Sequence, residues 1–129
     1  MTIRGRRNPH HLGTALSTRD PEGLARFYSG LLGWTYRVAD KTWVTMLVPG
    51  SRTYLAFALD EHHEPPVWPS EPGRPGQQMH LDIGVDELGP AVEDAIALGA
   101  RQASFQPQND VRVMLDPAGH PFCLYLEHD

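Results

Sequence analysis

The chain has 129 residues, a length typical of one domain, and a formal net charge of −5, which argues against nucleic acid and acidic membrane surfaces as partners. Cys123 is the single cysteine, which excludes internal disulfides and multi-cysteine zinc sites and favours a reducing compartment. No apolar run is long enough to span a membrane and no signal peptide opens the sequence, so we expect a soluble, cytoplasmic protein. The basic cluster of Arg4, Arg6 and Arg7 is interpreted as part of a solvated tail.

The first half of the chain predicts a strand, a helix and three further strands. Residues 12–18 are rich in β-branched and small residues, as strands are. A helix is expected over residues 21–32, with Asp20 as its N-cap, Pro21 at its first position and Gly33 at its C-terminal cap. Residues 34–38, 43–48 and 53–59 favour strands separated by polar turns. The first module, about residues 11–59, is therefore predicted to have the order βαβββ.

A proline-rich connector follows over residues 60–77. Its five prolines and two glycines exclude a helix or a central strand. Trp68 in its middle indicates that the connector is a covering flap, because a large apolar side chain in a free linker would have nothing to bury it. The segment Glu61-His62-His63-Glu64 at its start is rich in metal donors, and we interpret it as a solvated loop tip.

The second half of the chain repeats this order over about residues 78–127. A strand is expected at 79–85, a helix at 90–98 that starts with Gly89-Pro90, and strands near 100–105, 111–115 and 121–127. Asp20 precedes Gly33 by the same interval that separates Asp86 from Gly99. This repeat favours an internal duplication within one α+β domain over a solenoid, which needs more and shorter units.

Three sets of motifs carry a resemblance to a known family. They are Asp20-Pro21-Glu22 with Phe27-Tyr28 and Leu31-Leu32-Gly33-Trp34, then Gln78-Met79-His80-Leu81-Asp82, and finally Asp116-Pro117-Ala118-Gly119-His120-Pro121-Phe122. They resemble the vicinal oxygen chelate superfamily, which contains glyoxalases, bleomycin-resistance proteins and extradiol dioxygenases. The resemblance implies two βαβββ modules whose curved mixed sheets surround a cup, and often a homodimer. It also implies that His120 shapes the turn before the last strand.

The resemblance also identifies where metal-using members carry their ligands. The four positions correspond to Gly13 (or Thr14), about Ala56, His80 and Cys123. Of these, His80 keeps a ligand of the family's type, whereas Cys123 stands where a glutamate is usual. One imidazole and one thiol fall short of the three or four donors that a divalent ion needs, so we predict no metal and no other cofactor.

Several ionisable residues have alternative interpretations. His80 could be a wall residue of the cup, a structural histidine or a metal ligand, and a displaced metal site would pair it with His11. Asp82 could orient His80, anchor a cationic ligand or pair with Arg112, and we favour the ion pair with Arg112. Cys123 is interpreted as an inert buried thiol, although His80 could activate it as a nucleophile.

Aromatic residues on the predicted strands favour ligand binding, since small-molecule sites are mostly apolar and aromatic walls add stacking. We therefore predict a protein that binds a hydrophobic or aromatic small molecule without metal, as in drug or antibiotic sequestration. The alternative is a glyoxalase-like lyase, isomerase or dioxygenase with a displaced divalent metal site, or with His80 as a metal-free acid or base. A purely structural or regulatory domain is a third, weaker possibility. The predicted ligand-binding residues are Trp34, Trp43, Tyr54, Trp68, His80, Asp82, Arg112 and Cys123.

Overall fold

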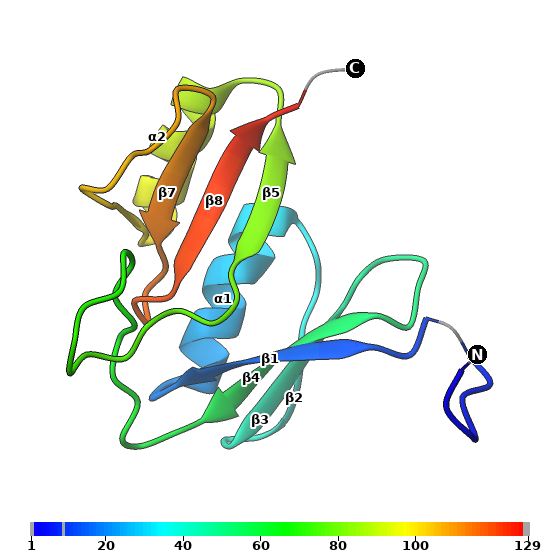
Figure 1. Ribbon diagram of the computed structural model, residues 1–129. Coiled ribbons are helices and arrows are strands. Elements are labelled where there is room, and N and C mark those ends of the chain that lie inside the picture. The colour runs from blue at the N-terminus through cyan, green and yellow to red at the C-terminus, as the bar shows by residue number, and fades with distance from the viewer. Residues whose placement is uncertain (1, 9, 128–129) are drawn as a thin grey trace. The chain divides into compact units, whose positions relative to one another are not determined.

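The computed structural model describes residues 2–8 and 10–127, and it divides the chain into two compact units, Met1–Glu61 and His62–Asp129. Each unit contains one helix and one four-stranded mixed sheet, with the helix packed on a face of its own sheet (Figure 1). This confirms the predicted α+β class and the two βαβββ modules. Within the described residues, no helix has the length and apolar character needed to cross a membrane.

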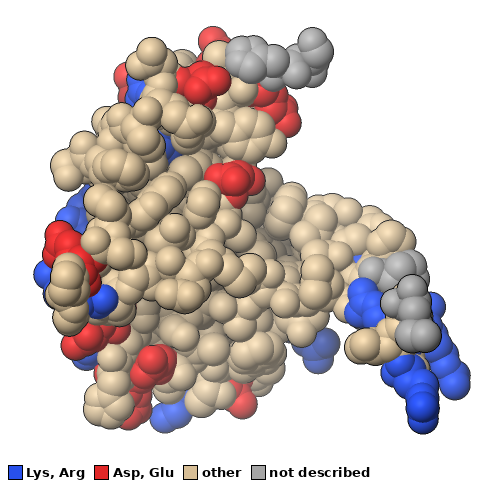
Figure 2. Space-filling view, viewed as in Figure 1, with Lys and Arg blue, Asp and Glu red and all other residues tan. Residues whose placement is uncertain are grey.

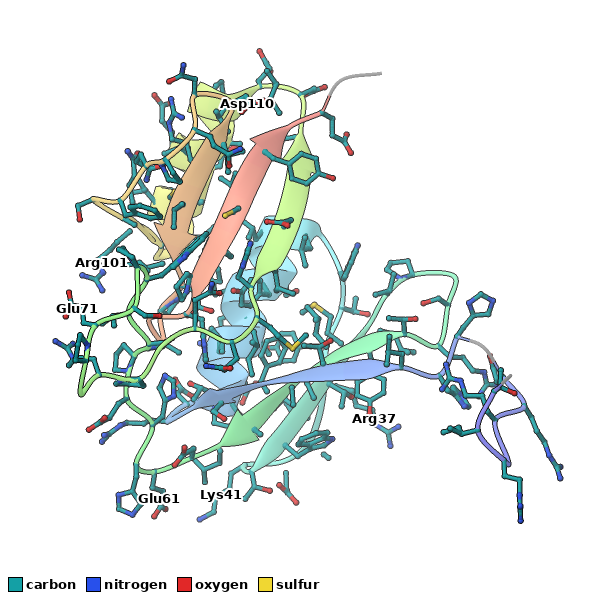
Figure 3. The ribbon with its side chains drawn as sticks, viewed as in Figure 1. Arg37, Lys41, Glu61, Glu71, Arg101 and Asp110 are labelled. Atoms are coloured by element: carbon teal, nitrogen blue, oxygen red, sulfur yellow. The ribbon has the colours of Figure 1, made fainter. Side chains whose placement is uncertain are left out.

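The first unit contains a sheet in the order β1-β4-β3-β2. The outer pair β1 and β4 is parallel, and the other neighbours are antiparallel. Its elements are β1 (Gly13–Thr18), α1 (Pro21–Leu32), β2 (Arg37–Asp40), β3 (Trp43–Leu47) and β4 (Tyr54–Leu59). Arg37 and Lys41, at the β2 and β3 edge, point away from this sheet (Figure 3).

Helix α1 begins and ends where the sequence predicts. The Asp20 side chain accepts a hydrogen bond from the Gly23 amide at 3.1 Å, and Gly33 takes the left-handed conformation with φ of 75°. The buried side of the helix includes Tyr28, whose ring stacks on Phe57 of β4 with centroids 5.8 Å apart. The core of the first unit therefore lies between α1 and the sheet face that carries Phe57.

The second unit repeats the topology of the first. Its elements are β5 (Leu81–Val85), α2 (Leu88–Leu98), β6 (Arg101–Gln102), β7 (Val111–Leu115) and β8 (Pro121–Leu126). They form a sheet in the order β5-β8-β7-β6, again with the first pair parallel. Asp110 lies at the end of the sheet where β7 begins, and Arg101 at the other end, where it pairs with Leu115 (Figure 3). The matching strand orders support the predicted duplication.

Several predicted boundaries differ from the structure by two or more residues. Strand β2 begins at Arg37 instead of residue 34, because the Trp34 carbonyl accepts a 2.6 Å hydrogen bond from the Ser29 hydroxyl and so belongs to the end of α1. Strand β5 begins at Leu81, and β6 has two residues instead of the expected six. The Gln106 side chain donates a hydrogen bond to the Val113 carbonyl and accepts one from the Val113 amide. These bonds occupy backbone groups of β7 with which a longer β6 would pair.

Helix α2 starts at Leu88, so Pro90 occupies its third position and not its first. Glu87 is the N-cap residue, with an extended backbone and no capping hydrogen bond from its side chain. Proline is accepted at this position because the first amides of a helix have no partner within the helix. The sequence therefore predicted the helix correctly but placed its first residue two positions too far along the chain.

The connector belongs to the second unit from His62 onward, and it is folded, not extended. The Val67 amide donates to the Pro75 carbonyl at 2.8 Å, and Val67 and Gly76 form an isolated β-bridge. His63 is half-buried: its Nε2 lies 2.8 Å from the Ala118 carbonyl, and its ring lies 4.9 Å from that of His120. The predicted solvated loop tip is therefore wrong for His63, although its neighbours Glu61, His62 and Glu64 are exposed.

Charged side chains are distributed unevenly. Lys and Arg gather on the N-terminal segment, which projects beside β1 of the first unit (Figure 2). Here an Arg6 Nη atom donates to the His11 carbonyl at 2.6 Å. The basic cluster that the sequence indicates is thus tied to the start of β1 by at least one backbone contact.

Candidate functional site

Three potential metal ligands meet on the second sheet. Strands β5 and β8 are parallel neighbours, and Asp82 stands opposite Cys123 in their register. His80 precedes Asp82 by two residues, so its side chain leaves the strand on the same side. The ligand atoms of His80, Asp82 and Cys123 all lie within 4.8 Å of one another. We call the surface formed by these three residues and Trp68 the His80 face.

Polar contacts hold both ring nitrogens of His80. Nε2 lies 3.1 Å from an Asp82 carboxylate oxygen, and Nδ1 lies 3.2 Å from the Gln77 side-chain oxygen. Both partners are acceptors. A ring with two protons donates a hydrogen bond to each of them, whereas a neutral ring donates to only one. The two contacts therefore fix the orientation of the imidazole ring.

Aromatic rings cover one side of the imidazole. The indole of Trp68 stacks on His80 with centroids 4.9 Å apart and planes inclined by 29°. Phe105 meets the same indole at 5.6 Å, edge to face. Trp68, His80 and Phe105 are each half-buried, so the connector brings an aromatic side chain onto the strand without burying it fully. The covering role of the connector stays a prediction.

The thiol of Cys123 is not an activated nucleophile. Burial, followed by the negative charge of Asp82 and a hydrogen bond to it, raises the pKa of Cys123 to about 11. The thiol is therefore protonated at neutral pH, and the residue is 3% exposed. The thiol is hydrogen-bonded to the Asp82 carboxylate, whose negative charge disfavours the thiolate, whereas an activated thiol has a base or a positive charge as its partner. These observations argue against the nucleophile hypothesis and favour an inert thiol.

Arg112 does not pair with Asp82, so that prediction is wrong. An Arg112 Nη atom instead donates to the backbone carbonyls of Asn109 at 3.0 Å and Val111 at 2.8 Å. Its neighbour Val113 stands opposite Cys123, and successive side chains of a strand point to opposite faces. Arg112 thus lies on the α2 side of the sheet, where it lines a hollow of about 250 Å³ with Leu88 and Val92. Asp82 instead contacts His80 and Cys123.

The remaining predicted ligand-binding residues lie in the first unit. Trp34 is in the link between α1 and β2, and Trp43 opens β3 with 37% of its surface exposed. The ring of Tyr54 lies against Gly13, where a Cβ atom would run into it. The structure thus groups four of the eight predicted residues, Trp68, His80, Asp82 and Cys123, and places Arg112 elsewhere in the same unit.

Gln77 and Phe105 belong to this site but were outside the predicted ligand-binding set. Gln77 contacts His80 through its side chain, and Phe105 contacts Trp68. Both contacts depend on the path of an irregular segment, the connector in one case and the stretch after β6 in the other. No sequence period marks such residues.

The four ligand positions that the resemblance implies do not fit a metal ion as a set. Gly13 and Ala56 have no side-chain donor, and Ala56 is fully buried. Nε2 of His11 lies 3.2 Å from an Nη atom of Arg52, so the displaced set of His11 and His80 gains no support. The second unit by itself provides three donors, because Asp82 joins His80 and Cys123.

A sequence profile described as a glyoxalase-like domain matches residues 13–125, which is most of the chain. The chain belongs to this family. The glyoxalase-like domain is a member of the vicinal oxygen chelate superfamily, as the motifs indicate, and no curated protein matches the chain. The match to the glyoxalase-like domain extends over both units and leaves out only residues 1–12 and 126–129.

Solved structures show the same fold. A glyoxalase/bleomycin resistance protein/dioxygenase family enzyme from Burkholderia phytofirmans is 19% identical, with a TM-score of 0.66 over 88% of this chain and 95% of that one. A glyoxalase-related enzyme from Fulvimarina pelagi is 24% identical, with a TM-score of 0.64 over 90% and 86%. The fosfomycin resistance protein FosX from Mesorhizobium loti is 16% identical, with a TM-score of 0.61 over 98% and 95%. At such identities the likeness establishes the fold of the glyoxalase-like domain and leaves its chemistry to be argued from the His80 face.

Proposed function

We propose that the protein binds a flat hydrophobic or aromatic small molecule at the His80 face. The observation that carries this proposal is the stack of Trp68 on His80 beside the carboxylate of Asp82. The two rings and Phe105 remain half-exposed, which leaves apolar ring surface for a further stacking partner. Aromatic pairs gain about 0.5–1.5 kcal/mol beyond area burial, so each added ring contact supports binding.

Asp82 provides the polar part of the proposed site. Its side chain is 59% exposed, so a ligand can reach the carboxylate that His80 contacts. Ligand sites combine apolar walls with a few placed polar groups that fix orientation. A bound molecule with a hydrogen-bond donor or a positive charge next to its ring would satisfy both features.

Binding without chemistry is what drug or antibiotic sequestration requires, and we include this role in the proposal. The FosX protein shows that the fold occurs in a resistance protein, and the bleomycin-resistance branch gives the same precedent. We further propose a homodimer, on the basis of the resemblance, and a cytoplasmic location, because the single cysteine favours a reducing compartment. Trp34, Trp43 and Tyr54 of the first unit stay as predicted ligand contacts.

A second candidate is a glyoxalase-like lyase, isomerase or dioxygenase. The observation that favours it is His80, whose imidazole lies beside the Asp82 carboxylate, because a histidine oriented by a carboxylate is a common general acid or base. Turnover of a bound compound would distinguish this candidate from a binder.

A thermal-shift screen of planar aromatic compounds tests the proposal. We expect some compounds to raise the melting temperature of the wild type and of Tyr36→Ala, an aromatic control in the first unit whose hydroxyl contacts Glu22. The same compounds should shift Trp68→Ala and Asp82→Asn much less. Equal shifts in all four proteins would contradict binding at the His80 face.

A further inference from the structure

We infer that His80, Asp82 and Cys123 form a binding site for one divalent transition-metal ion of the zinc type. The inference departs from the sequence-based expectation of no metal, which counted His80 and Cys123 alone. It shares His80 and Cys123 with the four-strand site that the resemblance implies, but Asp82 replaces the two positions of the first unit, so all three donors come from the second unit. It does not depend on the proposed small-molecule function, since the ion needs no organic ligand.

The spacing of the donors suits a tetrahedral ion. Zinc binds nitrogen and oxygen at about 2.0 Å and sulfur at about 2.3 Å, so neighbouring donors of a tetrahedron lie roughly 3.5 Å apart. Here Nε2 of His80 lies 3.1 Å from the Asp82 carboxylate, and all three donors fall within 4.8 Å. Cys123 is fixed in the sheet, whereas the largely exposed Asp82 side chain can adjust to close the remaining gap.

The Gln77 side-chain oxygen provides an acceptor for the tautomer that a metal ligand needs, once an ion takes the place of a proton between Nε2 and Asp82. A proton on Nδ1 would be donated to the Gln77 side-chain oxygen at 3.2 Å, and Nε2 would then present its lone pair to Asp82 and Cys123. Histidine ligands commonly donate their other ring proton to such a partner, which fixes the orientation of the ring. We assign Gln77 as a positioning residue, with the stacked Trp68 restricting rotation of the imidazole.

The donor set determines which ion fits. A thiolate, an imidazole and a carboxylate favour zinc and cobalt over magnesium and calcium, which prefer oxygen ligands alone. On binding, the bond between sulfur and hydrogen in Cys123 breaks, sulfur bonds the ion, and the proton passes to solvent. The two negative ligands balance the charge of the ion. Three protein ligands leave the fourth position open to water or to a ligand atom.

Cobalt titration of the full chain without an affinity tag tests this site. We expect one Co²⁺ per chain, with intense visible absorption from a tetrahedral ion and a charge-transfer band from the bond to sulfur. Added Zn²⁺ should remove both signals. Absence of the charge-transfer band in the wild type, or its persistence in Cys123→Ser, would overturn the inference.

Variants with intact folds separate the roles of the other residues. Asp82→Asn changes a largely exposed side chain, and we expect it to weaken cobalt binding at least about tenfold. Gln77→Ala should weaken binding about 10- to 100-fold, whereas Gln77→Glu, which keeps an acceptor for Nδ1, should restore it. His62→Ala removes an exposed histidine of the same unit and should leave cobalt binding unchanged. Unchanged affinity in Asp82→Asn, or a loss as large in His62→Ala, would refute the proposed ligand set.

Discussion

The indole of Trp68 lies on the imidazole of His80, with ring centroids 4.9 Å apart. Trp68 comes from the proline-rich connector, and His80 from the residue before β5. Because these rings meet, the connector is part of the His80 face and not a spacer between modules. A change in the connector should therefore alter both the stability of the second unit and the properties of His80.

Trp68→Ala should destabilise the protein by about 2–4 kcal/mol, because it removes a half-buried indole together with its contacts to His80 and Phe105. Trp68→Phe keeps a ring and should cost less than half as much. Urea denaturation followed by circular dichroism measures both values. If Trp68→Ala unfolds at the same urea concentration as the wild type, the contacts have no role in stability.

The metal-free protein should lose stability at high pH because of Cys123. The folded state holds the thiol proton more tightly than the unfolded chain, with a pKa of about 11 against the ordinary 9.0. This contribution is fully present below about pH 9 and disappears as the pH rises through about 11, a loss of about 2–3 kcal/mol. Denaturation of the wild type at increasing pH should show this loss.

Cys123→Ala is the matched control for that measurement. Tyrosines and Lys41 also titrate at high pH, and their effect is common to both proteins, so the difference between the two profiles reports the thiol. A constant difference from about pH 8 to about pH 11 would mean that the pKa of Cys123 is not raised on folding.

Asp116 organises the turn between β7 and β8. It is 2% exposed, and one carboxylate oxygen accepts from the Ala118 amide at 2.9 Å and the His120 amide at 3.0 Å. Asp116→Ala would leave these amides without that acceptor and should cost about 2–4 kcal/mol. Asp116→Asn keeps an acceptor and should recover about half of this loss. Thermal and urea unfolding of the three proteins measure the series, and equal stability of Ala and Asn variants would contradict the account.

Gly13 has no room for a side chain. A Cβ atom there would run into the ring of Tyr54, so Gly13→Ala should destabilise the first unit or displace that ring, at a cost of about 1–3 kcal/mol. Adding Tyr54→Ala should make the Gly13→Ala change nearly neutral, since the obstructing ring is gone. A double-mutant cycle measures this coupling, and additive costs would show that the ring of Tyr54 is not the source of the Gly13→Ala cost.

The sequence predicted the regular elements well because their signals are local. Asp20, Pro21 and Gly33 define the ends of α1 by capping chemistry, and the equal spacing of Asp86 and Gly99 indicates the repeat. The start of α2 was predicted two residues late, because proline is equally acceptable at the third helical position. The short β6 could not be foreseen, since the side chain of Gln106 takes backbone bonds that a longer strand would make.

The candidate site was predictable in its strands and not in its connections. Alternation along β5 places His80 and Asp82 on one side, and the resemblance placed Cys123 beside them. The error over Arg112 arose because the register of β7 against β8 decides its face, and sequence does not give that register. Gln77 escaped notice because its contact with His80 depends on the folded path of the connector.

Ligand binding at the His80 face is tested most directly by fluorescence of a variant whose remaining tryptophan is Trp68. Trp34→Phe combined with Trp43→Phe gives this protein, because the chain has three tryptophans. Titration with a planar compound that stabilises the wild type should quench or shift the emission of Trp68 in a saturable way, and Asp82→Asn in the same background should weaken the effect. Emission of Trp68 that stays unchanged while the compound still stabilises the protein would show that binding occurs elsewhere.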